Sequence, residues 1–556
     1  MRLVPSSPES KFHFRVLSRL NAMACLLALS VVSISTGCGS SHSSPVTPPP
    51  LSGNTSVTLL LSSTANGRLL NYGMYIQSLT LNGKSGKSAT LISSEQPAEF
   101  MHLNGLIEPY GTSTVPQDIY TSATAKIGYA SFTCVTVQGP SDPTPGSLTM
   151  STYAYGGVPD SAISVNLPNP ITITGDTLSV KLNLQVSQSA TLPSSCYTAQ
   201  FPAPYTITPN FELSSISTVA NPVSSANGRI EGLVGEIQSI ATSGNRFTLY
   251  LGESSRGQSI GGPGSPRSAT ISVDSKTTFY GSVGLVGLQA GSFVDLDGAL
   301  QSDSSIAASR ISVHDPTALN VMFGPAADIS AAVPEFFSFS LGSQGVDYDK
   351  TPFSLGIYKY SPTTVFQTTE QFSNLGTLPF VPNFQGSNLV PGQNLAIYSQ
   401  NVHFSAPDQY TPATTMTLLP QTINGTIVGP LTNGLNGYLV QLAVYDLFPI
   451  LAVQPGQPNF LAHADLVEVY TDSSTSMLNT KPLTNGGTGR FYGLIFNDNG
   501  SLKMDCAQVR DGVDVTPVTG AASPANFASS PLSAKLPKVT FHQSPDGKRQ
   551  FYTYTK

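Results

Sequence analysis

The stretch ATISVDSKTTFYGSVGLVGLQAGSFVDLD, residues 269–297, defines the unit from which most of the chain is built, because its order of features returns twice downstream. A β-branched run leads into a polar turn at Asp274, then to Thr277 and Phe279, and a Leu-Gln-Ala-Gly segment precedes a second apolar run. Short β-branched runs bounded by Asp, Ser and Gly are typical of strands joined by turns. The stretch therefore predicts strand, turn and strand.

The same order of features recurs at residues 358–366 with 389–397, and more loosely at 467–477. In each copy a long first strand, a meander, an intervening segment and a closing hairpin give the layout of a small OB-like barrel. Three such barrels are predicted, at residues 226–315, 318–405 and 420–513.

Composition sets the class of protein. A chain of 556 residues should hold roughly three to five domains. Charged residues are only 10%, but 40% hydrophobic residues are enough for packed cores. Gly and Pro punctuate short β-branched runs, which predicts an all-β, multi-domain chain. A net charge of −6 gives no electrostatic surface for nucleic acid.

Residues 1–38 read as an export signal, with basic residues first and an apolar run at 22–34. This run is shorter than the roughly 20 apolar residues of a permanent membrane helix. The sequence Ser-Thr-Gly-Cys at 35–38 resembles the lipobox of bacterial lipoproteins, which implies a lipid on Cys38 as the mature N-terminus. The alternative is an ordinary cleaved signal with an incidental cysteine.

Residues 39–53 are rich in Pro and Ser, and such a segment suits a solvated tether that reaches roughly 45 Å. The chain is therefore expected to be exported and held at the membrane through its N-terminal lipid. Gly39 rather than Asp follows Cys38, which in a Gram-negative host favours the outer membrane or the cell surface.

Apolar and polar residues alternate from 54 to 215, which predicts a β-sandwich. This region resembles a family of bacterial lipoprotein domains of unknown function with a transthyretin-like sandwich. The resemblance implies the sandwich and brings no catalytic residues. The residues that carry it are 56–61, 78–83, Phe100, Leu103, Leu106, Val115, Pro116 and 119–123.

The barrel repeats resemble a second uncharacterised bacterial family, with the pattern G-x-V, V-D-x-x-T-x-F and L-x-x-G-x-x-V. The first copy fits this pattern well. The third copy shows no clean L-x-x-G strand, which weakens the prediction that its barrel closes. Residues 514–556 are expected to be a linker and a C-terminal hairpin, with strands at 539–541 and 551–554 that pair with a neighbouring sheet.

Export into an oxidising compartment makes Cys134 and Cys196 a plausible disulfide. A loop of about 60 residues closed in this way would stabilise the fold by roughly 4 kcal/mol. Cys506 is left single, and free buried thiols are the alternative for all three.

Other candidate sites have simpler explanations. Residues 83–88, GKSGKS, resemble a phosphate loop but lack its first glycine and lie between two strands, so a solvated hairpin loop is expected. Glu95 and Glu99 are expected at the solvated surface rather than as a catalytic pair. The Asp- and Asn-containing stretches at 295–298, 347–349 and 497–500 could offer oxygen ligands, but they are expected to mark turns rather than calcium sites. No catalytic residue, metal site or cofactor is predicted.

The resulting hypothesis is a non-catalytic envelope lipoprotein, a structural or partner-binding array of β-domains. One alternative is a surface glycan-binding protein, since OB-like barrels and sandwiches carry such faces and the chain has 22 Tyr, although it has no Trp. Two clusters, Tyr358 with Tyr360 and Tyr552 with Tyr554, could stack on sugars or could pair across strands. The other alternative is a hydrolase with a site assembled from distant loops.

Overall fold

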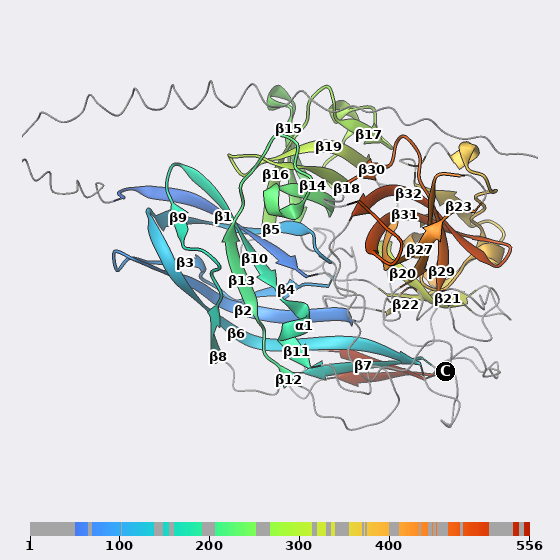
Figure 1. Cartoon of the computed structure of the whole chain (residues 1–556), viewed down its shortest axis with the longest axis horizontal. Coiled ribbons are helices and arrows are strands. Elements are labelled where there is room, and N and C mark those ends of the chain that lie inside the picture. The colour runs from blue at the N-terminus through green and yellow to red at the C-terminus, as the bar shows by residue number, and fades with distance from the viewer. Residues whose placement is uncertain are drawn as a thin grey trace, which may run out of the picture. The chain divides into compact units, whose positions relative to one another are not determined.

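The chain divides into two units, Met1–Pro50 and Leu51–Lys556, and the computed structural model describes residues of the second unit only. The described residues are mostly β-strand, and α-helix is limited to short segments such as α1, Val186–Ser189 (Figure 1). The prediction of an all-β, multi-domain chain is confirmed. The described ranges are 51–64, 69–101, 103–137, 148–154, 161–191, 206–251, 267–313, 320–329, 335–339, 355–369, 372, 375–399, 411–432, 435–442, 448, 452, 465–478, 482–510, 538–543 and 550–555.

Two sheets form the N-terminal sandwich. The first has the order β13-β10-β1-β5, with β1 Asn54–Ser63, β5 Ile107–Pro116, β10 Thr177–Leu184 and β13 Phe211–Ser215. The second has the order β3-β2-β6-β7, with β4 paired to β2, and β8 and β9 paired to β6. Its strands are β2 Leu69–Gly83, β3 Ser88–Ile92, β4 Gln96–Glu99, β6 Asp118–Val137, β7 Leu148–Ala154, β8 Ser161–Val165 and β9 Ile171–Ile173. The short strands β11 Ala190–Thr191 and β12 Thr206–Ile207 form a separate pair.

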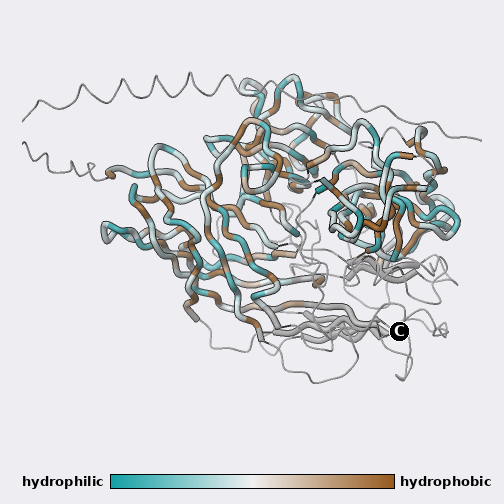
Figure 2. Tube along the Cα trace, viewed as in Figure 1, coloured by the Kyte–Doolittle hydropathy of each residue, from teal (hydrophilic) through white to brown (hydrophobic). Residues whose placement is uncertain are grey.

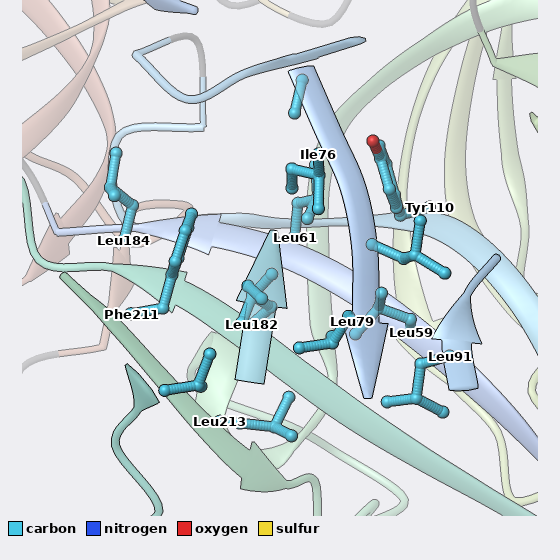
Figure 3. Packing of buried hydrophobic residues seen from close by; sticks show 14 of the residues in the cluster. Leu59, Leu61, Ile76, Leu79, Leu91, Tyr110, Leu182, Leu184, Phe211 and Leu213 are labelled. Carbon is cyan, nitrogen blue, oxygen red and sulfur yellow. The ribbon is translucent and has the colours of Figure 1, made fainter. Parts of the chain in front are cut away.

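The core of the sandwich lies between these two sheets. Leu59 and Leu182 from one sheet and Ile76 and Leu79 from the other are almost fully buried in one cluster (Figure 3). Burying one such side chain contributes about 1.5–3 kcal/mol. Hydrophobic and hydrophilic residues are interspersed along the strands rather than collected in long apolar runs (Figure 2). The alternation of apolar and polar residues that predicted the strands therefore also determines which side chains face the core.

The first barrel closes through a parallel pair. Its strands follow the ring order β14-β15-β16-β19-β18, and β18 returns to β14. This order, with the third and fifth strands parallel, is that of an OB barrel. The short β17, which pairs with β19, was not predicted. The strands are β14 Arg229–Ala241, β15 Arg246–Leu251, β16 Arg267–Ser272, β17 Thr278–Tyr280, β18 Phe293–Leu300 and β19 Ile306–Val313.

The third barrel has the same ring, β27-β28-β29-β32-β31, and β29 pairs in parallel with β32. The third barrel is therefore closed, although its sequence had weakened that prediction. A short β30 pairs with β32, as β17 pairs with β19 in the first barrel. The strands are β27 Gln421–Pro430, β28 Gly437–Leu442, β29 Leu466–Tyr470, β30 Ser476–Met477, β31 Thr488–Asp498 and β32 Ser501–Arg510.

The second barrel has a fifth strand in two pieces. One piece, β25, pairs in parallel with β22, and the other, β26, pairs with β24. Both pieces lie beyond residue 405, so the predicted end of this repeat is wrong. The polar stretch SAPDQYTP at 405–412 reads as a linker, although its last two residues form β25, so the fifth strand was not predicted. The strands are β20 Asn320–Ile329, β21 Glu335–Phe339, β22 Leu355–Lys359, β23 Val365–Thr368, β24 Asn394–Ser399, β25 Thr411–Pro412 and β26 Thr415–Leu418.

The recurring threonine closes the same turn in all three barrels. In the first barrel the amide of Asp274 donates to Thr277 Oγ1 (3.0 Å), and Thr277 Oγ1 donates to the carbonyl of Ala308 (2.7 Å). Each hydroxyl thus joins the turn after the third strand to the fifth strand, using both its acceptor and its donor. The other copies are Thr364 with Ser361 and Ala413, and Thr475 with Asp472 and Cys506.

The Leu-x-x-Gly segment also ends in one recurring turn. The amide of Gly291 (φ +84°) donates to the carbonyl of Ile237 on β14 (2.8 Å), and the amide of Ile237 donates to Ser292 (2.9 Å). The same two bonds join Gly392 and Gln393 to Ala326, and Gly486 and Gly487 to Ile427. Residues 483–486, Leu-Thr-Asn-Gly, are therefore the third copy of this segment, and the expectation that it is missing is wrong.

Apolar side chains of the second and third barrels pack in one cluster. The ring of Phe380, which lies between β23 and β24, has its centroid 5.4 Å from that of Tyr470 and 5.8 Å from that of Phe496. Leu389 and Leu494 are fully buried in the same cluster. These two barrels therefore share part of their hydrophobic core.

The C-terminal strands β33 Lys538–Gln543 and β34 Gln550–Thr555 form the predicted hairpin. They make a two-stranded sheet of their own, so pairing with a neighbouring sheet is not found within the described residues. Across the described ranges, no helix is long and apolar enough to span a bilayer.

Candidate functional site

Two aspartates and an arginine form an ion-paired group on the outer face of the first barrel. Asp295 and Asp297 occupy alternate positions of β18, and the period of two places them on one face. Arg310 lies opposite Asp297 on β19. Its Nε is 2.7 Å from Asp297 Oδ2, and its Nη2 is 2.5 Å from Asp295 Oδ1.

The charge on Arg310 is fixed. Only 12% of its side chain is exposed, and burial opposes the charge. Asp295 and Asp297 outweigh the burial and hold the pKa of Arg310 well above its ordinary value. Asp297 also accepts the amide of Gly232 (2.8 Å), which links β18 to β14. The group is therefore an ion pair that holds strands together rather than a source of protons.

A second charged group joins the first barrel to the third. Glu231 on β14 pairs with Arg229 on the same strand and with Arg510 at the end of β32. Removing one partner of a pair this well buried lowers the stability of the fold, because the remaining charge is then buried without its partner. A carboxylate neutralised by guanidinium groups is also a poor general base. The arrangement suits structure better than catalysis.

A third ion pair joins the sandwich to the first barrel. Arg267 Nη1 on β16 is 3.1 Å from Glu108 Oε1 on β5, and the guanidinium carbon lies 5.4 Å from the centre of the Tyr110 ring. Burial raises the pKa of Tyr110, against the opposing charge of Arg267. Tyr110 therefore stays neutral and packs as a core residue.

The third barrel buries a thiol beside a titratable carboxyl. Burial raises the pKa of the Cys506 thiol to about 12, and Cys506 Sγ donates to the carbonyl of Gln508 (3.2 Å), so the thiol is a poor nucleophile. Burial first, and then the charge of Asp472, raise the pKa of Asp505 to about 6. The charge of Asp505 therefore changes near pH 6.

The predicted lipidation and disulfide residues lie mostly outside the described residues. The backbone of Cys134 lies in β6, opposite Leu69 and Ser151. Cys38 and Cys196 fall outside the described ranges, so the lipid anchor and the Cys134–Cys196 disulfide stay predictions. Cys506 is a free, buried cysteine.

The structure gives Glu95 and Glu99 separate partners. The carboxylate of Glu99 is buried and accepts the amides of Tyr72 (3.0 Å) and Met101 (2.9 Å). Glu95 accepts from the side chain of Gln77 (3.2 Å) at the surface. The expectation of a solvated side chain is therefore wrong for Glu99, which orders the backbone around β2.

The three stretches considered for calcium do not share one kind of structure. Asp295 and Asp297 lie within β18 and not in a turn, which corrects the prediction. Residues 497–500 do form a turn, with Asn499 and Gly500 at positive φ, and residues 347–349 lie outside the described ranges. Among the residues that the structure describes, no group of three His, Cys, Asp or Glu side chains is placed to hold a metal ion.

Of the tyrosines considered as sugar platforms, the structure describes the side chains of Tyr358 and Tyr360. Tyr358 is 1% exposed within the core of the second barrel. Tyr360 meets the ring of Phe366 edge-on, with centroids 5.6 Å apart. The ring of Tyr358 therefore has no open face for a pyranose, whereas Tyr360 is only half-buried.

Sequence reasoning missed the ion pairs between elements. The alternation Asp-x-Asp within β18 was a usable signal, because it places two carboxylates on one face, where a cation on the neighbouring strand can pair with both. The partners Arg310 and Arg510 could not be chosen from spacing alone, since several arginines lie at similar strand positions.

No match to this chain was found among curated proteins or among solved structures. One family model matches part of it. Residues 234–312 match the family described as Domain of unknown function (DUF5666). The match runs from β14 to β19 and includes both recurring turns of the first barrel.

Proposed function

We propose that this protein is a non-catalytic lipoprotein of the cell envelope, which holds an array of β-domains near a membrane for structural use or for binding a partner. The observation that supports this most is how the buried charges are used. Glu108, Glu231, Arg267 and Arg510 pair between domains, which favours a fixed arrangement of the domains over a reactive cleft.

The attachment is proposed from the sequence. A lipid on Cys38 would anchor the chain, and residues 39–53 would separate the folded domains from the bilayer. The proposed location is the outer membrane or the cell surface, and the proposed partner is another envelope protein or a glycan.

The test compares wild type with Cys38→Ala in fractionated cells of the native host. The wild-type chain is expected in the membrane fraction, released by detergent but not by high salt. Cys38→Ala should leave that fraction. Cys25→Ala is the matched control, because this cysteine lies within the apolar run of the export signal and should leave the distribution unchanged.

Two results would count against the anchor. One is a wild-type chain that stays soluble after export. The other is a Cys38→Ala chain that partitions with membranes as fully as wild type does.

A further inference from the structure

The GKSGKS sequence builds a tight loop between β2 and β3. The amide of Gly83 donates to the carbonyl of Lys87 (2.8 Å), and the amide of Gly86 donates to Gly83 (3.1 Å). Gly86 has φ +84°, which side chains rarely adopt, and a Cβ on Gly83 would lie 2.2 Å from Asp118 Oδ2. The positive φ of Gly86 and the closeness of the Asp118 side chain to Gly83 therefore explain both glycines, and the two lysines are left to explain.

Lys87 connects three segments of the chain. Its Nζ donates to the carbonyl of Leu51 (3.0 Å), just before β1, and to the carbonyl of Gln117 (2.9 Å), between β5 and β6. Bonds from an ammonium group are stronger than bonds between neutral groups. Lys84 in the same loop has an exposed side chain. The two lysines of the motif thus differ in role.

Further hydrogen bonds fix the same place. The amide of Gln117 donates to Gly53 (2.9 Å), and the side-chain amide of Gln117 donates to Gly175 (3.1 Å). Thr55 Oγ1 donates to the same carbonyl of Gly175 (2.6 Å). The start of β1 is therefore held from several sides.

Strand β1 lies inside its sheet, between β10 and β5. It runs parallel to β10 from Ser56 opposite Thr177 to Ser63 opposite Leu184, and antiparallel to β5. The ladder bonds lie across the strand direction. A pull along β1 from its N-terminal end would have to break many of these bonds together, whereas a pull across the sheet would break them one after another.

We propose that Lys87 clamps the base of the N-terminal segment to the sandwich, so that tension arriving through residues before Leu51 acts along β1. The clamp is inferred from the contacts of Lys87 alone. The inference that tension reaches it depends on the proposed lipid anchor.

The clamp is tested by limited chymotrypsin digestion of the purified mature chain, with mass spectrometry to follow cleavage after Leu51. Lys87→Met should be cut there about ten times faster than wild type, because both bonds to Nζ are lost. Lys84→Met, the matched control, should be cut at the wild-type rate. Equal rates for the two variants would overturn the proposal.

The thermal midpoint, followed by tyrosine fluorescence, separates a local effect from a global one. The proposal requires Lys87→Met to melt within a few degrees of wild type. A variant that unfolds as a whole would show that Lys87 is needed for the fold itself and would overturn the clamp. These readouts need no membrane, so their failure would leave the proposed anchor at Cys38 untouched.

Tension is applied by single-molecule pulling between a peptide tag inserted after Ser44 and the C-terminus. Lys87→Met should lower the force at which the sandwich unfolds, and Lys84→Met should not. Equal forces for wild type and both variants would remove the mechanical part of the proposal.

Discussion

At the scale of single residues, a threonine hydroxyl makes the same pair of hydrogen bonds in each of the three barrels. Thr277, Thr364 and Thr475 each accept an amide at the start of a turn and donate to the fifth strand. The turn itself could be predicted from Asp, Ser and Thr. The bond to the fifth strand could not, because its acceptor is a backbone carbonyl, which leaves no mark on the sequence.

Thr277→Val tests this role. The change keeps the shape of the side chain but leaves the carbonyl of Ala308 and the amide of Asp274 without this partner, which should cost about 1–3 kcal/mol in the first barrel. Amide hydrogen exchange in β16 and β19 measures the loss. Thr278→Val is the control, since Thr278 is exposed, and an equal loss in both variants would contradict the assigned role.

Asp505→Asn tests the titrating carboxyl of the third barrel. The folded pKa of about 6 lies above the ordinary value, so proton binding stabilises the fold at low pH and this contribution is lost as pH rises through 6. After a discount for partial exposure, the loss is about 1–2 kcal/mol.

The asparagine variant should therefore gain stability over wild type at pH 8 and lose that advantage near pH 4. Urea unfolding at both pH values gives the comparison. The same difference between the two proteins at both pH values would show that Asp505 carries its charge at no cost.

At the scale of elements, the Leu-x-x-Gly turn fixes where the fourth strand begins. In the first two copies an apolar run follows the glycine closely, whereas Gly486 is followed by Gly-Thr-Gly and then by Arg490. The turn of the third copy was therefore not recognised in the sequence, although its two backbone hydrogen bonds to β27 match those of the other copies.

Gly486→Ala should destabilise the third barrel by about 1–2 kcal/mol, because its φ of +77° is unfavourable for any residue with a Cβ. Gly429→Ala is the control. A Cβ would meet nothing within 4 Å at either position, and Gly429 does not have positive φ, so that change should be nearly neutral. Urea unfolding measures both variants, and equal effects would contradict the role of the backbone conformation.

At the scale of the whole molecule, the alternation of residues from Val57 onward was enough to predict an all-β chain with a sandwich and barrels. It was not enough to place the contacts between domains. Phe380 reads as an ordinary loop residue, yet it packs against Tyr470 and Phe496 of the next barrel. Arg510 reads as the end of a strand, yet it pairs with Glu231 far away in the sequence. Contacts of this kind form between folded domains, and local sequence patterns do not predict which residues of two domains meet.

The proposed anchor also belongs to this scale, because it decides where the whole array acts. The most direct test is the mass of the N-terminal peptide of the mature protein, extracted from the cell envelope with detergent. We predict that this peptide begins at Cys38 and carries the added mass of acyl chains. A peptide that begins elsewhere, or one that begins at an unmodified Cys38, would contradict the account.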